Sequence, residues 1–246
     1  GYEILKYYKD DIEVTNKNDS SPLTKADLAS NKIILNSLHD LDTTIPILSE
    51  ESLIEWNRRK NWNKYWLVDP LDGTKEFIKK NGEFTVNIAL IENNKPILGV
   101  IFAPAKSLLY FAQKNNSSYK INTNVELESL NEAKKIEVSI QSNITRIIGS
   151  RSHSNSAFDK LISEKYPEAK IVQAGSSLKF CLIAEGEADF YPRLGPTSEW
   201  DIAAGHIIVN EAGGKIKTFE ESNINYNTKE DILNPQFYAI GKTKLK

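Results

Sequence analysis

The first half of the chain mixes a helical spacing of apolar residues with shorter, strand-like apolar runs. Residues 1–9 have the pattern of an amphipathic helix. A second helix is predicted over residues 24–38, with Thr24 as N-cap and Asp27 in the first turn. Its apolar side is predicted to carry Leu28, Ile33, Ile34, Leu35 and Leu38. Strands are predicted at residues 46–48, 66–68, 84–91, 96–103 and 108–112, and these indicate an antiparallel sheet.

After residue 143 strands and helices alternate. The predicted strands are residues 146–149, 170–173 and 188–192, and the predicted helices are residues 156–165, 177–186 and 200–212. Such alternation favours an α/β layer arrangement. The sequence therefore predicts an α+β domain over residues 1–142 and an α/β domain over residues 143–246, joined in one compact body.

Composition narrows the classes of partner. The 246 residues include 31 Lys and Arg against 33 Asp and Glu, so the net charge of −2 gives no overall reason to expect nucleic acid or membrane binding. No apolar run approaches the roughly 20 residues that span a bilayer, and no signal peptide is recognisable. A single cysteine, Cys181, excludes an internal disulfide and fits the reducing cytoplasm, where we expect the protein. Its apolar neighbours predict a buried, unreactive thiol.

Residues 69–74 place two carboxylates on a rigid bend. Asp69 ends an apolar run, and Pro70 restricts Asp69 to an extended conformation. Asp72 follows three residues later, before Gly73, which allows a tight turn close to a ligand. Two adjacent carboxylates repel each other unless a cation lies between them, which favours a Mg²⁺ site. From this stretch alone, a solvated turn is an equal alternative.

Three further acids change that balance. Glu50 ends the apolar run at residues 46–48, while Asp27 and Asp201 lie at the starts of predicted helices. Each of the last two would separately be explained as a capping acid. Together the acids match the needs of a phosphatase with two or three Mg²⁺ ions, and the Thr74 hydroxyl could orient a water molecule.

The candidate anion-binding residues lie in the second half. Arg151, His153, Lys179 and Arg193 each lie near a Gly or Ser, whose amides and hydroxyls bind phosphate readily. Any one of them alone is better explained as a solvated surface charge. The distribution of acids and bases nevertheless predicts a phosphate ester held in a cleft between the two halves.

Several motifs resemble the inositol monophosphatase superfamily. They are D-P-L-D-G-T at residues 69–74, W-D-I-A-A-G at residues 200–205, and S-E-E-S at residues 49–52, with Ser where the family usually has Gly. Further segments resemble the bacterial CysQ branch, the 3′(2′),5′-bisphosphate nucleotidases: residues 21–27, 65–78, 81–90, 149–153, 175–181 and 191–197. The resemblance covers nearly the whole chain.

This resemblance implies a layered α-β-α-β-α sandwich of the inositol monophosphatase and fructose-1,6-bisphosphatase type. It also implies Mg²⁺-dependent, lithium-sensitive hydrolysis of 3′-phosphoadenosine 5′-phosphate to AMP and phosphate, as in sulfur assimilation and nucleotide recycling. A monomer or homodimer is expected, in the cytoplasm or peripheral to the inner membrane, with a small phosphorylated nucleotide and no nucleic acid as partner.

The resemblance also implies roles for individual residues. Metal ligands would be Glu50, Asp69, Asp72, Asp201 and the backbone carbonyl of Leu71. Glu50 and Thr74 would activate the attacking water, and Asp27 would help with a further metal or its water. Substrate would contact the amides of Gly73 and Thr74, while Ser176, Lys179, Arg193 and His153 would hold the nucleotide and its second phosphate.

Three alternatives stay open at this point. An inositol or sugar monophosphatase would share the acids without needing a second phosphate grip. A haloacid-dehalogenase type also carries D-G-T, but it spaces its two acids as D-x-D, whereas two residues separate Asp69 from Asp72. A nucleotide-sensing binding protein could keep the same fold without catalysis.

Overall fold

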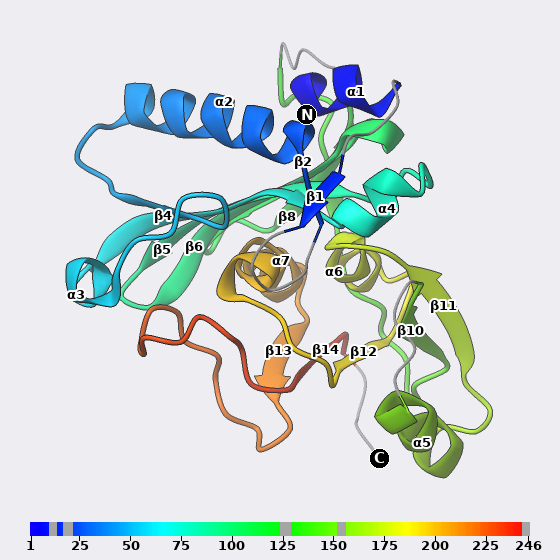
Figure 1. Ribbon diagram of the computed structural model, residues 1–246. Helices are drawn as coiled ribbons and strands as arrows, with labels where there is room; N and C mark the ends of the chain where they lie inside the picture. Colours follow the sequence, from blue (N-terminus) through cyan, green and yellow to red (C-terminus); the bar gives the residue numbers. More distant parts are fainter. Residues whose placement is uncertain (10–13, 17–21, 124–128, 152–155, 243–246) are drawn as a thin grey trace.

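Helices and sheets alternate in five layers in the computed structural model, which describes residues 1–9, 14–16, 22–123, 129–151 and 156–242 (Figure 1). Helices α1 (Tyr2–Tyr8) and α2 (Lys25–Leu41) cover one face of a seven-stranded sheet. Helices α6 (Leu178–Ala184) and α7 (Glu199–Glu211) lie between that sheet and a five-stranded sheet. Helix α5 (Ser156–Lys165) forms the outermost layer. The predicted layered sandwich is confirmed.

The first sheet has the strand order β3-β4-β5-β6-β7-β8-β9. Its first pair is parallel and every other neighbouring pair is antiparallel. The strands are β3 (Ile47–Ser49), β4 (Lys64–Asp72), β5 (Thr85–Glu92), β6 (Lys95–Ala103), β7 (Leu108–Gln113), β8 (Ser118–Asn122) and β9 (Lys134–Ile136). The five strands expected from the apolar runs are present, whereas β8 and β9 were not predicted.

The second sheet has the order β11-β10-β12-β14-β13. β10 (Arg146–Ser150) is parallel to β11 (Lys170–Ala174) and to β12 (Phe190–Arg193). The last strand in sequence, β14 (Phe237–Ile240), lies between β12 and β13 (Lys215–Thr218) and is antiparallel to both. The smaller elements are the hairpin β1 (Val14–Asn16) and β2 (Pro22–Thr24), helices α3 (Trp56–Arg59) and α4 (Thr74–Ile78), and the 3₁₀ turn η1 (Pro104–Lys106).

The largest hydrophobic cluster surrounds α6 and α7. It joins Leu67 of the first sheet to Ile207 of α7 and Phe237 of the second sheet. The layers pack closely, since a Cβ on Gly205 of α7 would lie 2.4 Å from the Phe180 ring. Cys181 belongs to this cluster, and burial raises the pKa of its thiol, as expected for an unreactive cysteine. The division into two domains stays a prediction, because both sheets share this core.

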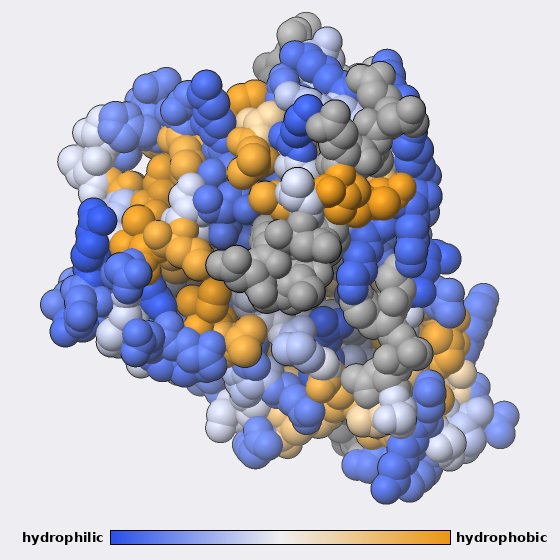
Figure 2. All heavy atoms as spheres, viewed as in Figure 1, coloured by the Kyte–Doolittle hydropathy of each residue, from blue (hydrophilic) through white to orange (hydrophobic). Residues whose placement is uncertain are grey.

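The apolar side predicted for α2 is confirmed in part and wrong in part. Leu28 and Ile33 are about half exposed (50% and 48%), whereas Ile34 and Leu38 are buried against the sheet. The face toward the sheet includes Ser30, whose hydroxyl donates to the Pro70 carbonyl at 2.8 Å. A polar residue takes an inward position because it satisfies a buried backbone carbonyl. In Figure 2 the outer side of α2 is hydrophilic and apolar residues gather below it.

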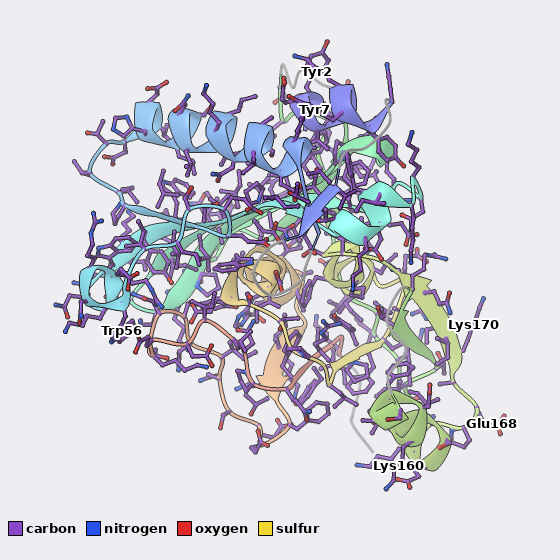
Figure 3. The ribbon with its side chains drawn as sticks, viewed as in Figure 1. Tyr2, Tyr7, Trp56, Lys160, Glu168 and Lys170 are labelled. Carbon is purple, nitrogen blue, oxygen red and sulfur yellow. The ribbon has the colours of Figure 1, made fainter. Side chains whose placement is uncertain are left out.

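The outer layer is charged and faces solvent. Lys160, Glu168 and Lys170 project outward around α5 and the edge strand β11, as Figure 3 shows. Beneath α5, Phe158 and Leu161 pack on a third cluster of buried side chains from the second sheet. In the part of the chain that is described, no helix has the length and apolar character needed to cross a membrane. Cytoplasmic location and peripheral membrane attachment stay predictions.

Candidate active site

The bend at residues 69–74 begins inside strand β4. The pairing of β4 with β5 is regular up to Asp69, opposite Asn87, and then shifts before Asp72, opposite Thr85. This irregularity follows from Pro70, which has no amide to donate to the ladder. Asp69 is buried, and its Oδ1 accepts a hydrogen bond from the Leu71 amide at 3.1 Å. Both acids therefore lie at the end of a central strand, as predicted.

Gly73 and Thr74 begin the short helix α4. Gly73 has φ of +87°, a left-handed conformation that favours glycine. The Thr74 hydroxyl donates to Asp27 Oδ1 at 3.2 Å and lies 3.4 Å from the Leu71 carbonyl oxygen. The other oxygen of Asp27, Oδ2, accepts from the amide and hydroxyl of Thr24, at 2.8 and 2.6 Å. Asp27 is thus both a capping-box acid and a partner of Thr74.

The remaining acids come from β3 and α7. Glu50 follows β3, and its amide donates to the Val68 carbonyl at 3.1 Å, which places it beside β4. Asp201 is the third residue of α7, where its Oδ2 accepts from the Ser198 amide at 2.8 Å in a second capping box. The structure therefore brings Glu50, Asp72 and Asp201 to one cavity.

These carboxylates repel one another. Burial raises the pKa of Asp69 well above its usual range, and the charges of Glu50, Asp72 and Asp201 raise it further. Burial, followed by Asp72 and Glu50, also raises the pKa of Asp201 to about 8. The cluster is therefore costly to ionise without a cation.

The donor chemistry fits a hard divalent cation, because every candidate ligand is an oxygen and several are carboxylates. Within the described ranges, however, no three His, Cys, Asp or Glu side chains form a ready-made ligand group. Instead Asp69, Asp72 and Asp201 each accept hydrogen bonds from neighbouring protein groups. Metal binding would exchange these hydrogen bonds for metal contacts.

Two cations line the same cavity as the acids. Lys179 of α6 is buried, and its ammonium group lies 5.8 Å from the centre of the Tyr191 ring. Burial, aided by Arg193, lowers the pKa of Lys179 to about 8, although Asp72 opposes the shift. Arg193 donates through Nη2 to the Pro196 carbonyl at 2.8 Å, while its buried Nε has no hydrogen-bond partner among the described residues. A half-buried guanidinium whose buried Nε lacks a partner is suited to an anion.

A hydroxyl and amide network supports Asp72, and sequence reasoning identified only Ser176 of it. Asp72 Oδ2 accepts from Ser176 Oγ at 2.8 Å, from Ser177 Oγ at 2.7 Å and from Asn87 Nδ2 at 3.3 Å. Thr85 Oγ1 lies 2.5 Å from Ser176 Oγ. The sequence held a signal for Thr85 and Asn87. They are two residues apart on a predicted strand, so their side chains lie on the same face of the sheet, and they pair with Asp72 and Asp69 of β4.

The predicted site residues largely converge. A cavity of about 270 Å³ is lined by Glu50, Asp72, Gly73, Thr74, Ser176, Lys179, Arg193 and Asp201. Asp69 and Asp27 are not among the lining residues. Asp27 contacts the lining residue Thr74 by a hydrogen bond, and Asp69 is close enough to Glu50, Asp72 and Asp201 for their charges to raise its pKa. Leu71 is buried in β4, with its carbonyl toward Thr74. His153 lies outside the described residues, so its predicted role stays a prediction.

Comparison with known proteins gives a consistent result. The family model described as "Inositol monophosphatase family" matches residues 1–243. The 3′(2′),5′-bisphosphate nucleotidase CysQ of Buchnera aphidicola is 48% identical over 243 residues, covering 97% of this chain and 88% of the relative. CysQ of Escherichia coli K12 is 43% identical over 226 residues, covering 92% and 88%.

Solved structures agree with the sequence comparison. The crystal structure of CysQ from Bacteroides thetaiotaomicron, described as a bacterial member of the inositol monophosphatase family, superposes with a TM-score of 0.87 at 40% identity. It covers 99% of this chain and 93% of that one. The suhB protein of Bartonella henselae, with a TM-score of 0.78 and 24% identity over 98% of this chain and 89% of its own, supports the fold alone.

Proposed function

Because this chain belongs to the inositol monophosphatase family, we propose that it is a Mg²⁺-dependent 3′(2′),5′-bisphosphate nucleotidase. Its substrate is 3′-phosphoadenosine 5′-phosphate, and its products are AMP and phosphate. The observation that carries the proposal is one cavity lined both by the acids Glu50, Asp72 and Asp201 and by the cations Lys179 and Arg193. Relatives at 43–48% identity bear the name of this activity. Nothing at the site favours an inositol or sugar monophosphatase.

The acids would hold two or three Mg²⁺ ions. Glu50, Asp69, Asp72, Asp201 and the carbonyl of Leu71 are the proposed ligands, and their mutual repulsion supports this assignment. When bound, Mg²⁺ supplies charge neutralisation on the phosphate and lowers the pKa of water. Asp72 would be kept in place by the hydroxyls of Ser176 and Ser177.

The protein's own groups would orient the attack. The Thr74 hydroxyl donates to Asp27, which leaves the lone pairs of Thr74 Oγ1 free to accept a hydrogen bond from the attacking water. Glu50, beside the same cavity, would accept the proton of that water. The amides of Gly73 and Thr74 would hold the phosphate that is cleaved. The attacking water would then lie in line with the leaving 3′-oxygen.

The second phosphate would be held by Lys179 and Arg193. Arg193 lies near Lys179 and helps to lower its pKa, so an anion bound beside Lys179 would favour its charged form. Ser176 would add a hydroxyl contact, and His153 a contact to the nucleotide. A monophosphate has no use for this grip, which is why the proposal names a bisphosphate.

Phosphate release across a panel of esters tests the proposal. We expect 3′-phosphoadenosine 5′-phosphate to be turned over far faster than inositol 1-phosphate, and EDTA to stop the reaction. Preference for inositol 1-phosphate would replace the proposed substrate. Tight nucleotide binding without phosphate release in Mg²⁺ would instead indicate a binding protein.

Asp69→Asn tests the metal assignment. It keeps the shape of a buried side chain and removes one charge from the cluster, so we expect turnover to fall by at least ~10³-fold. The melting temperature in EDTA should stay near that of the unaltered chain, which separates lost chemistry from lost folding. Ordinary activity of this variant at limiting Mg²⁺ would refute the assignment.

A further inference from the structure

Glu83 connects segments from both sheets. It lies in the loop between α4 and β5, and its Oε2 accepts from Arg151 Nε at 2.6 Å and from the Gly175 amide at 2.8 Å. Its Oε1 accepts from Arg151 Nη2 at 3.0 Å, and that nitrogen also donates to the Gln173 carbonyl at 3.0 Å. A single carboxylate thus holds the ends of β10 and β11 against the first sheet.

The turn that Glu83 holds is tightly packed. A Cβ on Gly175 would lie 3.0 Å from the Glu83 carbonyl oxygen and 2.7 Å from Glu76 Cγ, and a Cβ on Gly73 would lie 3.0 Å from Ser176 Cβ. Ser176 has φ of +51°, which a residue with a side chain adopts only when its surroundings enforce it. Glu83 supplies part of that enforcement, because it binds the amide directly before Ser176.

Ser176 also lines the cavity and connects its acids to its cations along the chain. The hydroxyl of Ser176 lies 2.8 Å from Asp72 Oδ2. Lys179, three residues later in the chain, lines the same cavity. The position of the Gly175–Ser176 turn therefore sets the spacing between the acids and the cations. A substrate with two phosphates must span that spacing, whereas a monophosphate contacts only one side.

We propose that Glu83 is a positioning residue that sets specificity for a bisphosphate over a monophosphate, by holding the Gly175–Ser176 turn at the correct distance from Asp72. This inference rests on the proposed function. Glu83 itself does not line the cavity. Its charge is paired with Arg151, so it acts through the turn and not by contact with substrate.

The first test compares two substrates in Glu83→Ala and Glu83→Gln. For adenosine 3′,5′-bisphosphate we expect Glu83→Ala to raise KM about tenfold with little change in kcat, the size expected when a hydrogen bond to a charged group is lost. For adenosine 3′-monophosphate we expect a change of less than about twofold. Glu83→Gln should be intermediate, since its amide oxygen can still accept from Gly175 but cannot pair with Arg151.

The second test needs no turnover, so it stands even if the proposed activity fails. In EDTA, Lys179 and Arg193 would hold a phosphate without metal. Binding of AMP under these conditions can be followed by calorimetry. We expect Glu83→Ala to weaken AMP binding about tenfold. Glu137→Gln is the matched control, because Glu137 is an exposed acid that pairs with Lys135 at 2.9 Å and does not line the cavity.

The outcomes separate clearly. A selective loss for the bisphosphate together with weaker AMP binding supports the inference. Equal losses for both substrates, no change in either, or absent AMP binding in the unaltered chain would overturn it. Melting temperatures identify a variant that fails to fold, and in that case the milder Glu83→Gln decides. Hydrolysis by the unaltered chain tests the proposed function separately.

Discussion

Helices α2 and α7 both begin with a capping box whose third residue is an acid of the candidate site. In α2 the pair is Thr24 and Asp27, and in α7 it is Ser198 and Asp201. In each box one carboxylate oxygen accepts from the N-cap amide at 2.8 Å. Both helices therefore use the same local motif to fix an acid at their first turn.

The surroundings of the two acids differ. Six of the 17 residues of α2 are buried, against ten of the 13 residues of α7. Asp27 meets hydroxyl groups, from Thr24 and Thr74, whereas Asp201 meets the charges of Asp72 and Glu50. One motif can therefore serve either to orient a neighbour or to carry charge, depending on what faces the second carboxylate oxygen.

Asp201→Asn should give the largest effect. The amide oxygen can still cap the Ser198 amide, so the helix should form, but the charge that would bind Mg²⁺ is lost. We expect kcat/KM to fall by at least ~10³-fold, measured by phosphate release at saturating Mg²⁺. A circular dichroism melt in EDTA checks the fold. Activity close to that of the unaltered chain would place Asp201 with Asp27 as a structural cap.

Asp27→Asn should give a smaller loss. Its amide oxygen can still cap Thr24, but its nitrogen cannot accept from Thr74, so the hydroxyl would turn toward the Leu71 carbonyl 3.4 Å away. We expect kcat to fall about 10- to 100-fold with KM almost unchanged, as for a lost orienting contact. Steady-state kinetics at several Mg²⁺ concentrations measure this. If Asp27→Asn matched Asp201→Asn, Asp27 would have to carry charge as well.

The smallest effect concerns stability and contrasts a buried histidine with an exposed one. Burial, with Lys95 and Lys217 adding to it, lowers the pKa of His206 in α7 to about 3, and its Nδ1 lies 2.8 Å from the Tyr226 hydroxyl. In the unfolded chain this histidine is protonated below about pH 6.5, whereas in the folded chain it stays neutral down to about pH 3. The free energy of unfolding therefore falls as the pH drops from 6.5 toward 3.

His206→Gln should remove that loss, worth roughly 3 kcal/mol between pH 6.5 and pH 4. Urea unfolding of the variant and of the unaltered chain across this range measures the difference. His39→Gln is the control, since His39 is exposed near the end of α2 and its replacement should leave the acid sensitivity in place. A variant whose stability keeps the full pH dependence would show that another group is responsible.

Much of the fold could be predicted because its signals are local. The apolar runs that became β3 to β7 are continuous, and Thr24 with Asp27 marks the start of α2. Strand β14 has only four residues, and it pairs with β12, which lies 44 to 50 residues earlier (Arg193 with Phe237, Phe190 with Ile240), so its formation depends on a partner far away in sequence. The inward face of α2 was predicted only in part, since Ile34 and Leu38 face the sheet as expected, but Ser30 also faces it to satisfy a distant carbonyl.

The candidate site divides in the same way. Asp69, Asp72 and Thr74 lie in one short motif, and the apolar run before it, with Pro70 and Gly73, predicts a strand end followed by a turn. Ser177 could not be assigned to Asp72 from spacing, because 105 residues separate them. The link between Glu83 and Gly175 likewise spans 92 residues and appears only once both sheets are in place.

The position of β14 has a consequence for how the protein is made. The seven-stranded sheet has all its strands once residue 136 is synthesised, but the five-stranded sheet lacks an interior strand until residue 240 is reached. At a translation rate of about 5–20 residues per second, that interval lasts roughly 5 to 20 s. In the last part of it, after α7 is completed at Glu211, the apolar side of α6 and α7 that will face Phe237 stays uncovered. A nascent chain is therefore most exposed to aggregation, and most in need of chaperones, shortly before its last strand leaves the ribosome.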